Sequence, residues 1–243
     1  MIETPFSICP EILSFAGCAE AKAQAAFSTI DTLEQYNGMK VLKAFLDHGV
    51  STAHLSGSTG YGYGDIGRET LDAVFASAFG AEDALVRHSF VSGTHALTVG
   101  LFGLLRPGDT LLSLTGSPYD TLEEVIGIRD SGRNDGSLSD WGVQYRQIEL
   151  KNGKIDLVEA ADAAKSAAVA YIQRSRGYSL RPSLSVEEIA EAVRVVKASN
   201  PGILVMVDNC YGEFTERAEP TAAGADLIAG SLIKNPGGGV ART

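Results

Sequence analysis

Apolar and polar residues follow two different periods along this chain. Several short segments are rich in apolar residues, and the most continuous of them have the composition of strands that are buried on both faces. Residues 143–150 alternate instead, as a strand with one wet face does. The pattern predicts strands at residues 84–91, 110–114, 143–150, 167–173, 203–207 and 225–233.

Between these segments, apolar residues recur every three or four positions, which predicts amphipathic helices. In residues 68–79, Leu71, Val74 and Phe75 share one face, and Gly80 is expected to end the helix. Ser185 and Glu188 have the spacing of a capping box that opens another helix. Further helices are predicted at residues 94–105, 119–129 and 156–165. Strands that alternate with helices predict an α/β three-layer sandwich around a mostly parallel sheet.

The first part of the chain has a different pattern. Residues 20–49 predict one long helix, in which Phe27, Ile30 and Leu33 share a face. We therefore expect residues 1–55 to form an N-terminal helical arm that packs on the body or contacts another subunit. Residues 56–243 are expected to form a single large α/β domain.

Composition narrows the classes of protein. The chain has 243 residues, 44% of them hydrophobic, and a net charge of −10, which argues against nucleic acid or an anionic membrane as a partner. Its three cysteines are far apart and lack the spacing of a zinc site, as expected in a reducing compartment. The sequence has neither a signal peptide nor an apolar run of membrane-spanning length, so we expect a cytoplasmic protein without a bound metal.

Chemically useful residues follow the ends of the predicted strands, where ligands bind in parallel sheets. They are Ser92, Gly93, Thr94, Tyr119, Arg174, Asp208 and Lys234. Together they suit an aromatic phosphate ester that carries an aldehyde. A lysine would form the Schiff base, a carboxylate would pair with the ring nitrogen, and N–H groups at a helix start would bind the phosphate.

Each of these residues also has a plainer interpretation when it is taken alone. Lys234 has the setting of a solvated turn residue, and Asp208 has that of a cap on the turn that follows a strand. Tyr119 follows a proline and suits packing in a turn. Only the combination of these residues favours a cofactor site.

The ordered motifs SGTHAL, SPYDT, VDNCYGEF and GSLIKNPGGG resemble those of the fold-type-I pyridoxal-phosphate enzymes. With GYGYGDIGRETL and IQRSRGYS, the chain resembles the methionine gamma-lyase-like family, which is also labelled aluminium-resistance or cystathionine beta-lyase-like. The resemblance covers nearly the whole chain. Relatives continue past the lysine into a smaller domain, and we expect that domain to be absent from these 243 residues.

The resemblance implies a role for individual residues. Lys234 would be the Schiff-base lysine, and Asp208 would be the partner of the pyridine nitrogen. Tyr119 would stack on the ring. Relatives place an asparagine near the ring hydroxyl, whereas this chain has QRSRG, so Arg174, Ser175 or Arg176 would bind the ring oxygen or a substrate carboxylate. The phosphate would be held by Ser92, Gly93, Thr94 and Ser231, with Tyr61 or Tyr63 supplied by a neighbouring subunit. Shared sites of this kind imply a homodimer or a homotetramer.

The expected activity is that of a pyridoxal 5'-phosphate-dependent carbon–sulfur lyase. It would act on a sulfur amino acid of the cystathionine or methionine type, by β- or γ-elimination. Two alternatives stay open. One is another reaction of the same cofactor, such as transamination, since the cofactor residues do not separate reaction types. The other is a catalytically silent form of the fold that serves as a binding or assembly module.

Overall fold

The computed structural model describes residues 5–61, 63–129 and 136–235. At its centre is a parallel sheet with the strand order β2-β1-β3-β4-β5. The strands are β1 (Thr110–Ser113), β2 (Gln144–Gln147), β3 (Val169–Gln173), β4 (Leu204–Asp208) and β5 (Leu227–Ala229). All four strand pairs are parallel. The predicted α/β fold class is therefore confirmed.

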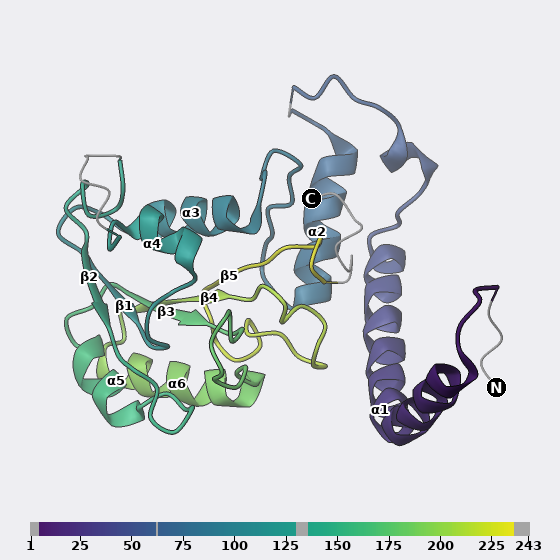
Figure 1. The fold of residues 1–243 in the computed structure, drawn as a ribbon. Coiled ribbons are helices and arrows are strands. Elements are labelled where there is room, and N and C mark those ends of the chain that lie inside the picture. The colour runs from purple at the N-terminus through teal and green to yellow at the C-terminus, as the bar shows by residue number, and fades with distance from the viewer. Residues whose placement is uncertain (1–4, 62, 130–135, 236–243) are drawn as a thin grey trace.

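Helices cover both faces of this sheet (Figure 1). One face carries α3 (Gly93–Leu104) and α4 (Asp120–Ile126), and the other carries α5 (Leu157–Ala164) and α6 (Val186–Ser199). Successive residues of a strand point to opposite faces, so the apolar strands supply two cores. Leu111, Tyr171 and Met206 belong to the core under α3 and α4. Ala170, Ile172 and Val205 belong to the core over α5 and α6.

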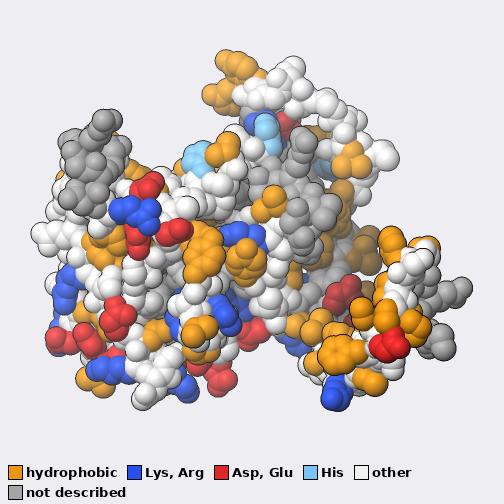
Figure 2. Space-filling view, viewed as in Figure 1, with side chains coloured by type: hydrophobic (Ala, Val, Ile, Leu, Met, Phe, Trp, Pro, Cys, Tyr) orange, Lys and Arg blue, Asp and Glu red, His pale blue; other side chains and the backbone are white. Residues whose placement is uncertain are grey.

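The N-terminal part consists of α1 (Pro10–Asp47), the short 3-10 helix η1 (Thr52–Leu55) and α2 (Ile66–Phe79). Proline suits the first position of a helix, and α1 begins at Pro10, ahead of the predicted start. The first half of α1 projects away from the sheet (Figure 1), and Figure 2 shows hydrophobic side chains gathered on it. Ile12, Phe15 and Phe27 are among the exposed residues of this half.

Several predicted elements differ from the structure. The strand predicted at residues 225–233 is confined to Leu227–Ala229, and residues 232–235 form a turn. Residues 84–91 do not form a strand. The Val86 N–H donates to Asp72 Oδ1 at 2.8 Å, and Arg87 pairs with the same carboxylate, so a side chain takes the place of a neighbouring strand. The helix predicted at residues 119–129 ends at Ile126, because Gly127 adopts the left-handed conformation that terminates helices.

Candidate active site

Three neighbouring strands end at the same level of the sheet. Asp208, the last residue of β4, is in register with Gln173 of β3 and with Ala229 of β5. The segments that follow these strands border a cavity of about 330 Å³. Five of the predicted site residues line it, namely Thr94, Tyr119, Arg176, Asp208 and Lys234. The carboxyl edge of the sheet thus brings together residues from five separate segments of the chain.

Asp208 is a buried and well-ordered acceptor. Its Oδ1 accepts from the backbone N–H of Cys210 at 3.0 Å, and its Oδ2 accepts from the Tyr171 hydroxyl at 3.2 Å. Burial raises the pKa of Asp208, while the bonds from Cys210 and the charge of Lys234 oppose that rise. A cationic N–H donor in the cavity would lower this desolvation cost, which is the relationship expected between a carboxylate and a protonated ring nitrogen.

Lys234 lies in the turn after β5. Its backbone N–H donates to Ser231 O at 3.0 Å, and its Nζ lies 4.8 Å from the centre of the Tyr211 ring. Tyr211 has a φ of 68°, which is unusual for a residue with a side chain. The Asn235 amide holds the Tyr211 carbonyl at 3.0 Å. The loop after β4 and the turn after β5 are therefore tied together around the lysine amine.

A second hollow of about 310 Å³ lies next to the first and is lined in part by Ser92, Gly93 and Ser231. A Cβ atom at Gly93 would lie 3.4 Å from Ser231 Cβ and 4.0 Å from Lys234 Nζ, so these groups meet at the start of α3. The buried Ser231 Oγ has no hydrogen-bond partner among the described residues. The start of a helix and an unpartnered hydroxyl suit a phosphate. The residues present therefore fit pyridoxal phosphate.

Tyr119 lines the 330 Å³ cavity and occupies the N-cap position of α4. Its hydroxyl donates to the Tyr178 hydroxyl at 2.7 Å, and this bond, together with burial, raises the pKa of Tyr119 to about 12. Thr94 Oγ1 lies 2.8 Å from Thr121 Oγ1 across the same cavity. Tyr119 is thus held as a neutral phenol, as a residue that stacks on a ring would be.

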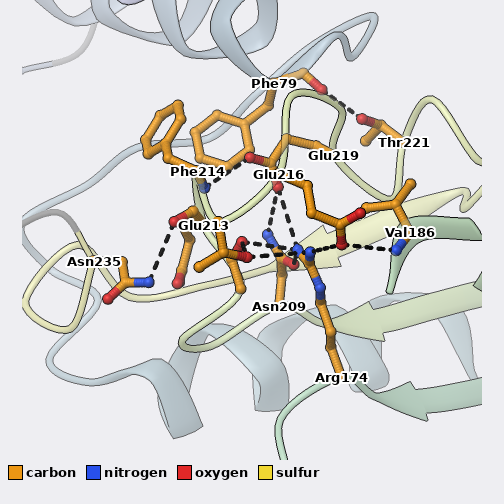
Figure 3. A network of polar contacts seen from close by, with 12 residues as sticks. Phe79, Arg174, Val186, Asn209, Glu213, Phe214, Glu216, Glu219, Thr221 and Asn235 are labelled. Carbon is orange, nitrogen blue, oxygen red and sulfur yellow. Dashed lines mark hydrogen bonds and ion pairs between the residues drawn. The ribbon is translucent and has the colours of Figure 1, made fainter. Parts of the chain in front are cut away.

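The two candidate arginines occupy different environments. Arg176 is exposed and lines the cavity. Arg174 is buried, and its guanidinium is occupied by protein acceptors (Figure 3). These acceptors are Leu184 O at 3.2 Å, Asn209 Oδ1 and Gly212 O at 2.8 Å, Thr215 Oγ1 at 3.2 Å and Glu216 Oε1 at 2.6 Å. Arg174 is not among the residues that line the cavity, and its geometry does not suit substrate binding.

Tyr61 and Tyr63 lie on the loop between η1 and α2 and do not line either cavity. Both are exposed, at 81% and 89%, and their ring centres are 5.8 Å apart. Within one chain, the structure does not bring them to Lys234.

Sequence reasoning missed several residues of the site. Tyr171 and Tyr211 contact Asp208 and Lys234 respectively, and Tyr178 holds Tyr119. Tyr171 lies inside an apolar strand, where a tyrosine is indistinguishable from a packing residue. Tyr178 could have been predicted, because the preceding Gly177 is a signal for a turn in the sequence. In the structure Gly177 has a φ of 58°, and the loop turns there toward Tyr119.

In the described ranges, no helix is both long and apolar enough to cross a membrane. The same ranges contain no group of three or more histidine, cysteine, aspartate or glutamate side chains arranged to hold a metal ion.

The parallel sheet, with Asp208 and Lys234 at its carboxyl edge, is the arrangement of the large domain of the fold-type-I pyridoxal-phosphate enzymes. Comparison with known proteins agrees. The model of the methionine gamma-lyase family matches residues 12–243, and the chain belongs to this family. Protein YnbB of Bacillus subtilis (strain 168) is 52% identical over 92% of the chain. L-methionine gamma-lyase of Pseudomonas putida is 28% identical over 72% of the chain and 39% of its own length.

Solved structures are similar over almost the whole chain. A proposed cystathionine beta-lyase involved in aluminium resistance from Clostridium acetobutylicum has a TM-score of 0.92 and 47% identity over 97% of this chain. A carbon–sulfur lyase involved in aluminium resistance from Clostridium novyi NT has a TM-score of 0.88 and 48% identity over 93% of it. The chain spans about half the length of these relatives, 53% of YnbB and 56% of the Clostridium acetobutylicum protein.

Proposed function

We propose that this chain binds pyridoxal 5'-phosphate and contributes the cofactor site of a carbon–sulfur lyase that acts on a sulfur amino acid. The observation that carries the proposal is the position of Lys234 between two groups. Its amine lies near Gly93 and Ser231 at the start of α3, and it lines the same cavity as the buried carboxyl of Asp208. The Ser231 hydroxyl has no hydrogen-bond partner among the described residues. Family membership and the carbon–sulfur lyase among the similar structures support the same reaction class.

The bound cofactor would supply an aldehyde for a lysine amine and a ring that withdraws electrons from the substrate's Cα. Ser92, Gly93, Thr94 and Ser231 would hold its phosphate. Asp208, oriented by Tyr171 and the Cys210 N–H, would keep a proton on the ring nitrogen.

The chemical step would belong to Lys234. Its amine would take the proton from the substrate's Cα as a general base. The carbon–sulfur bond at Cβ or Cγ would then break, and the sulfur would leave with the bonding electrons and take up a proton to become a thiol. Arg176, exposed at the mouth of the cavity, would bind the substrate carboxylate. Cystathionine and methionine have the required chemistry. Transamination would use the same cofactor residues but would retain the carbon–sulfur bond, so release of a thiol separates the two reactions.

Chemical labelling tests the cofactor assignment directly. The chain is incubated with pyridoxal phosphate, treated with borohydride to make any lysine–cofactor bond permanent, and digested for peptide mapping. We expect the added mass on Lys234, because it is the lysine that lines the cavity. Exposed lysines such as Lys165 serve as internal references for nonspecific labelling. Labelling that is no greater at Lys234 than at Lys165 would refute the assignment.

We further propose that the chain assembles as a homodimer or a homotetramer. The support is the apolar exposed half of α1 and the position of Tyr61 and Tyr63, which are exposed and line neither cavity of their own chain. A second copy could place one of these tyrosines at the phosphate. Light scattering should therefore give at least twice the mass of one chain. A chain that stays monomeric in light scattering while it binds pyridoxal phosphate would contradict the proposed homodimer or homotetramer.

A further inference from the structure

Glu213 is a buried acid in the loop between β4 and β5 that the proposed reaction does not use. It is 2% exposed and lines the same hollow as Ser92, Gly93 and Ser231. Its Oε1 accepts from the backbone N–H of Ser231 at 2.6 Å. Gly230 leaves room for this contact, because a Cβ atom there would collide with the carboxylate. The loop after β4 thereby holds the turn that carries Ser231 and Lys234.

A second contact strengthens the same connection. The Asn235 amide donates to Glu213 O at 3.2 Å and to Tyr211 O at 3.0 Å, as Figure 3 shows in part. Glu213 is thus bonded to Ser231 and to Asn235, which lie on either side of Lys234 in the sequence. Removing the carboxyl would release the Ser231 end of the turn.

Two polar atoms in this hollow are unsatisfied. Glu213 Oε2 and Ser231 Oγ are both buried, and neither has a hydrogen-bond partner in the described part of the chain. They belong to residues that are already bonded to each other through Oε1 and the Ser231 N–H. An anion that accepted a bond from Ser231 Oγ would therefore lie close to the Glu213 carboxyl.

The charges around Glu213 come from several segments. Burial raises the pKa of Glu213 to about 7; the Ser231 N–H and the charge of Lys234 oppose this rise, and Asp208 adds to it. On the α3 side the hollow is lined by the uncharged Ser92, Gly93 and Ala96. The remaining charged residues along the hollow are Asp83, Arg87, which pairs with Asp72, and Asp226, which pairs with Lys197. Among the charged side chains of the described residues, Lys234 and Asp208 influence the pKa of Glu213, and both effects are smaller than that of burial.

We propose that Glu213 is a positioning residue of the phosphate site, whose carboxyl fixes the Ser231–Lys234 turn and must take up a proton when an anion binds beside Ser231. A buried carboxylate and a second anion in one hollow repel each other, so binding favours the neutral acid. The proton comes from solvent, and the neutral acid gains an O–H that can donate to the anion. The inference rests on the proposed function, because it concerns the site for the cofactor's phosphate.

Sulfate is a suitable probe, since it keeps its double charge from pH 6.5 to 8.5 and any pH dependence comes from the protein. Its affinity for the full chain is measured by titration calorimetry at several pH values. For obligatory uptake of one proton, wild-type affinity should fall by up to about tenfold for each pH unit above 7. Glu213→Gln keeps the shape and an acceptor for Ser231, so its affinity should change by less than about twofold.

Three variants separate charge from position. Glu191→Gln on the exposed face of α6 removes one charge far from the site and should behave as the wild type. Glu213→Ala also loses the acceptor for Ser231 and should bind sulfate at least about tenfold more weakly than Glu213→Gln at every pH. If Glu213→Ala does not fold, the pH profile of Glu213→Gln decides the matter.

Several results would overturn the inference. One is an equal dependence of sulfate affinity on pH in the wild type and in Glu213→Gln. Another is a Glu213→Ala variant that binds sulfate as tightly as Glu213→Gln does. The third is a wild type that does not bind sulfate at pH 6.5. The borohydride labelling of Lys234 tests the proposed function separately. Labelling without proton-coupled sulfate binding removes only this inference, whereas coupled binding without labelling removes the proposed function and leaves a proton-linked anion site.

Discussion

Lys234→Ala is expected to lower the rate of cofactor-dependent thiol release by about 10³-fold or more. General acid–base groups contribute about 10²–10⁴-fold, and this variant also loses the amine that would bind the cofactor covalently. The measurement is the release of thiol and keto acid from cystathionine and from methionine, with added pyridoxal phosphate. The visible absorption band of the bound cofactor should disappear in the same variant.

The comparison needs variants that leave the fold intact. Lys234 is half-buried at the edge of the cavity, so its truncation should not unfold the chain. Lys234→Arg keeps a cation beside Asp208 and Glu213 but cannot act as the amine, and it should be as inactive as the alanine variant. Lys165→Ala, at an exposed ion pair with Asp162, should retain wild-type activity. Normal turnover by Lys234→Ala would show that the catalytic assignment is wrong.

Arg174→Ala is expected to lower the free energy of unfolding by about 3–5 kcal/mol, because it leaves the buried Glu219 carboxylate, the partly exposed Glu216 carboxylate and two backbone carbonyls without their cation. Glu219 is buried, and its Oε2 lies 3.7 Å from Arg174 Nη1. Glu216 and the carbonyl of Gly212 lose direct hydrogen bonds. The measurement is urea denaturation of the apoprotein, followed by circular dichroism.

This experiment also separates the structural role of Arg174 from the substrate-binding role that the sequence suggested. Arg174→Lys keeps the charge but loses the planar fork, so its stability should fall between those of wild type and Arg174→Ala. Arg194→Ala on the exposed face of α6 should change stability by less than about 0.5 kcal/mol. Wild-type stability of Arg174→Ala together with a large rise in KM would instead support the substrate-binding role.

Local pattern was sufficient for most of the fold. Strands such as 203–207 are apolar because both faces are buried, and this composition distinguishes a parallel sheet from other arrangements. The capping box at Ser185 and Glu188 forms as its spacing predicts, with Glu188 N donating to Ser185 Oγ at 3.1 Å. The strand predicted at residues 84–91 was wrong, because the acceptor for the Val86 N–H is the side chain of Asp72, fourteen residues away on another element.

The sequence likewise predicted some features of the candidate site and not others. The order of the strands along the chain and the rule for parallel sheets bring Thr94, Tyr119, Asp208 and Lys234 to one cavity. The sequence could not separate Arg174 from Arg176, since both follow β3 closely, two positions apart, and carry the same side chain. The structure places Arg174 against the loop after β4, some 35 to 42 residues later in the chain, and leaves Arg176 at the cavity.

The sequence by itself determined the α/β architecture and the family, because these depend on periodicity and on motifs that are local in the chain. It also supplied the residues that we propose for the chemistry. The tertiary structure alone decided which polar groups are left unsatisfied and which are occupied. Within residues 5–61, 63–129 and 136–235, Ser231 Oγ and Glu213 Oε2 have no hydrogen-bond partner, whereas Arg174 is bonded to several acceptors. Burial and long-range hydrogen bonds depend on how distant segments pack, and no spacing along the chain encodes them.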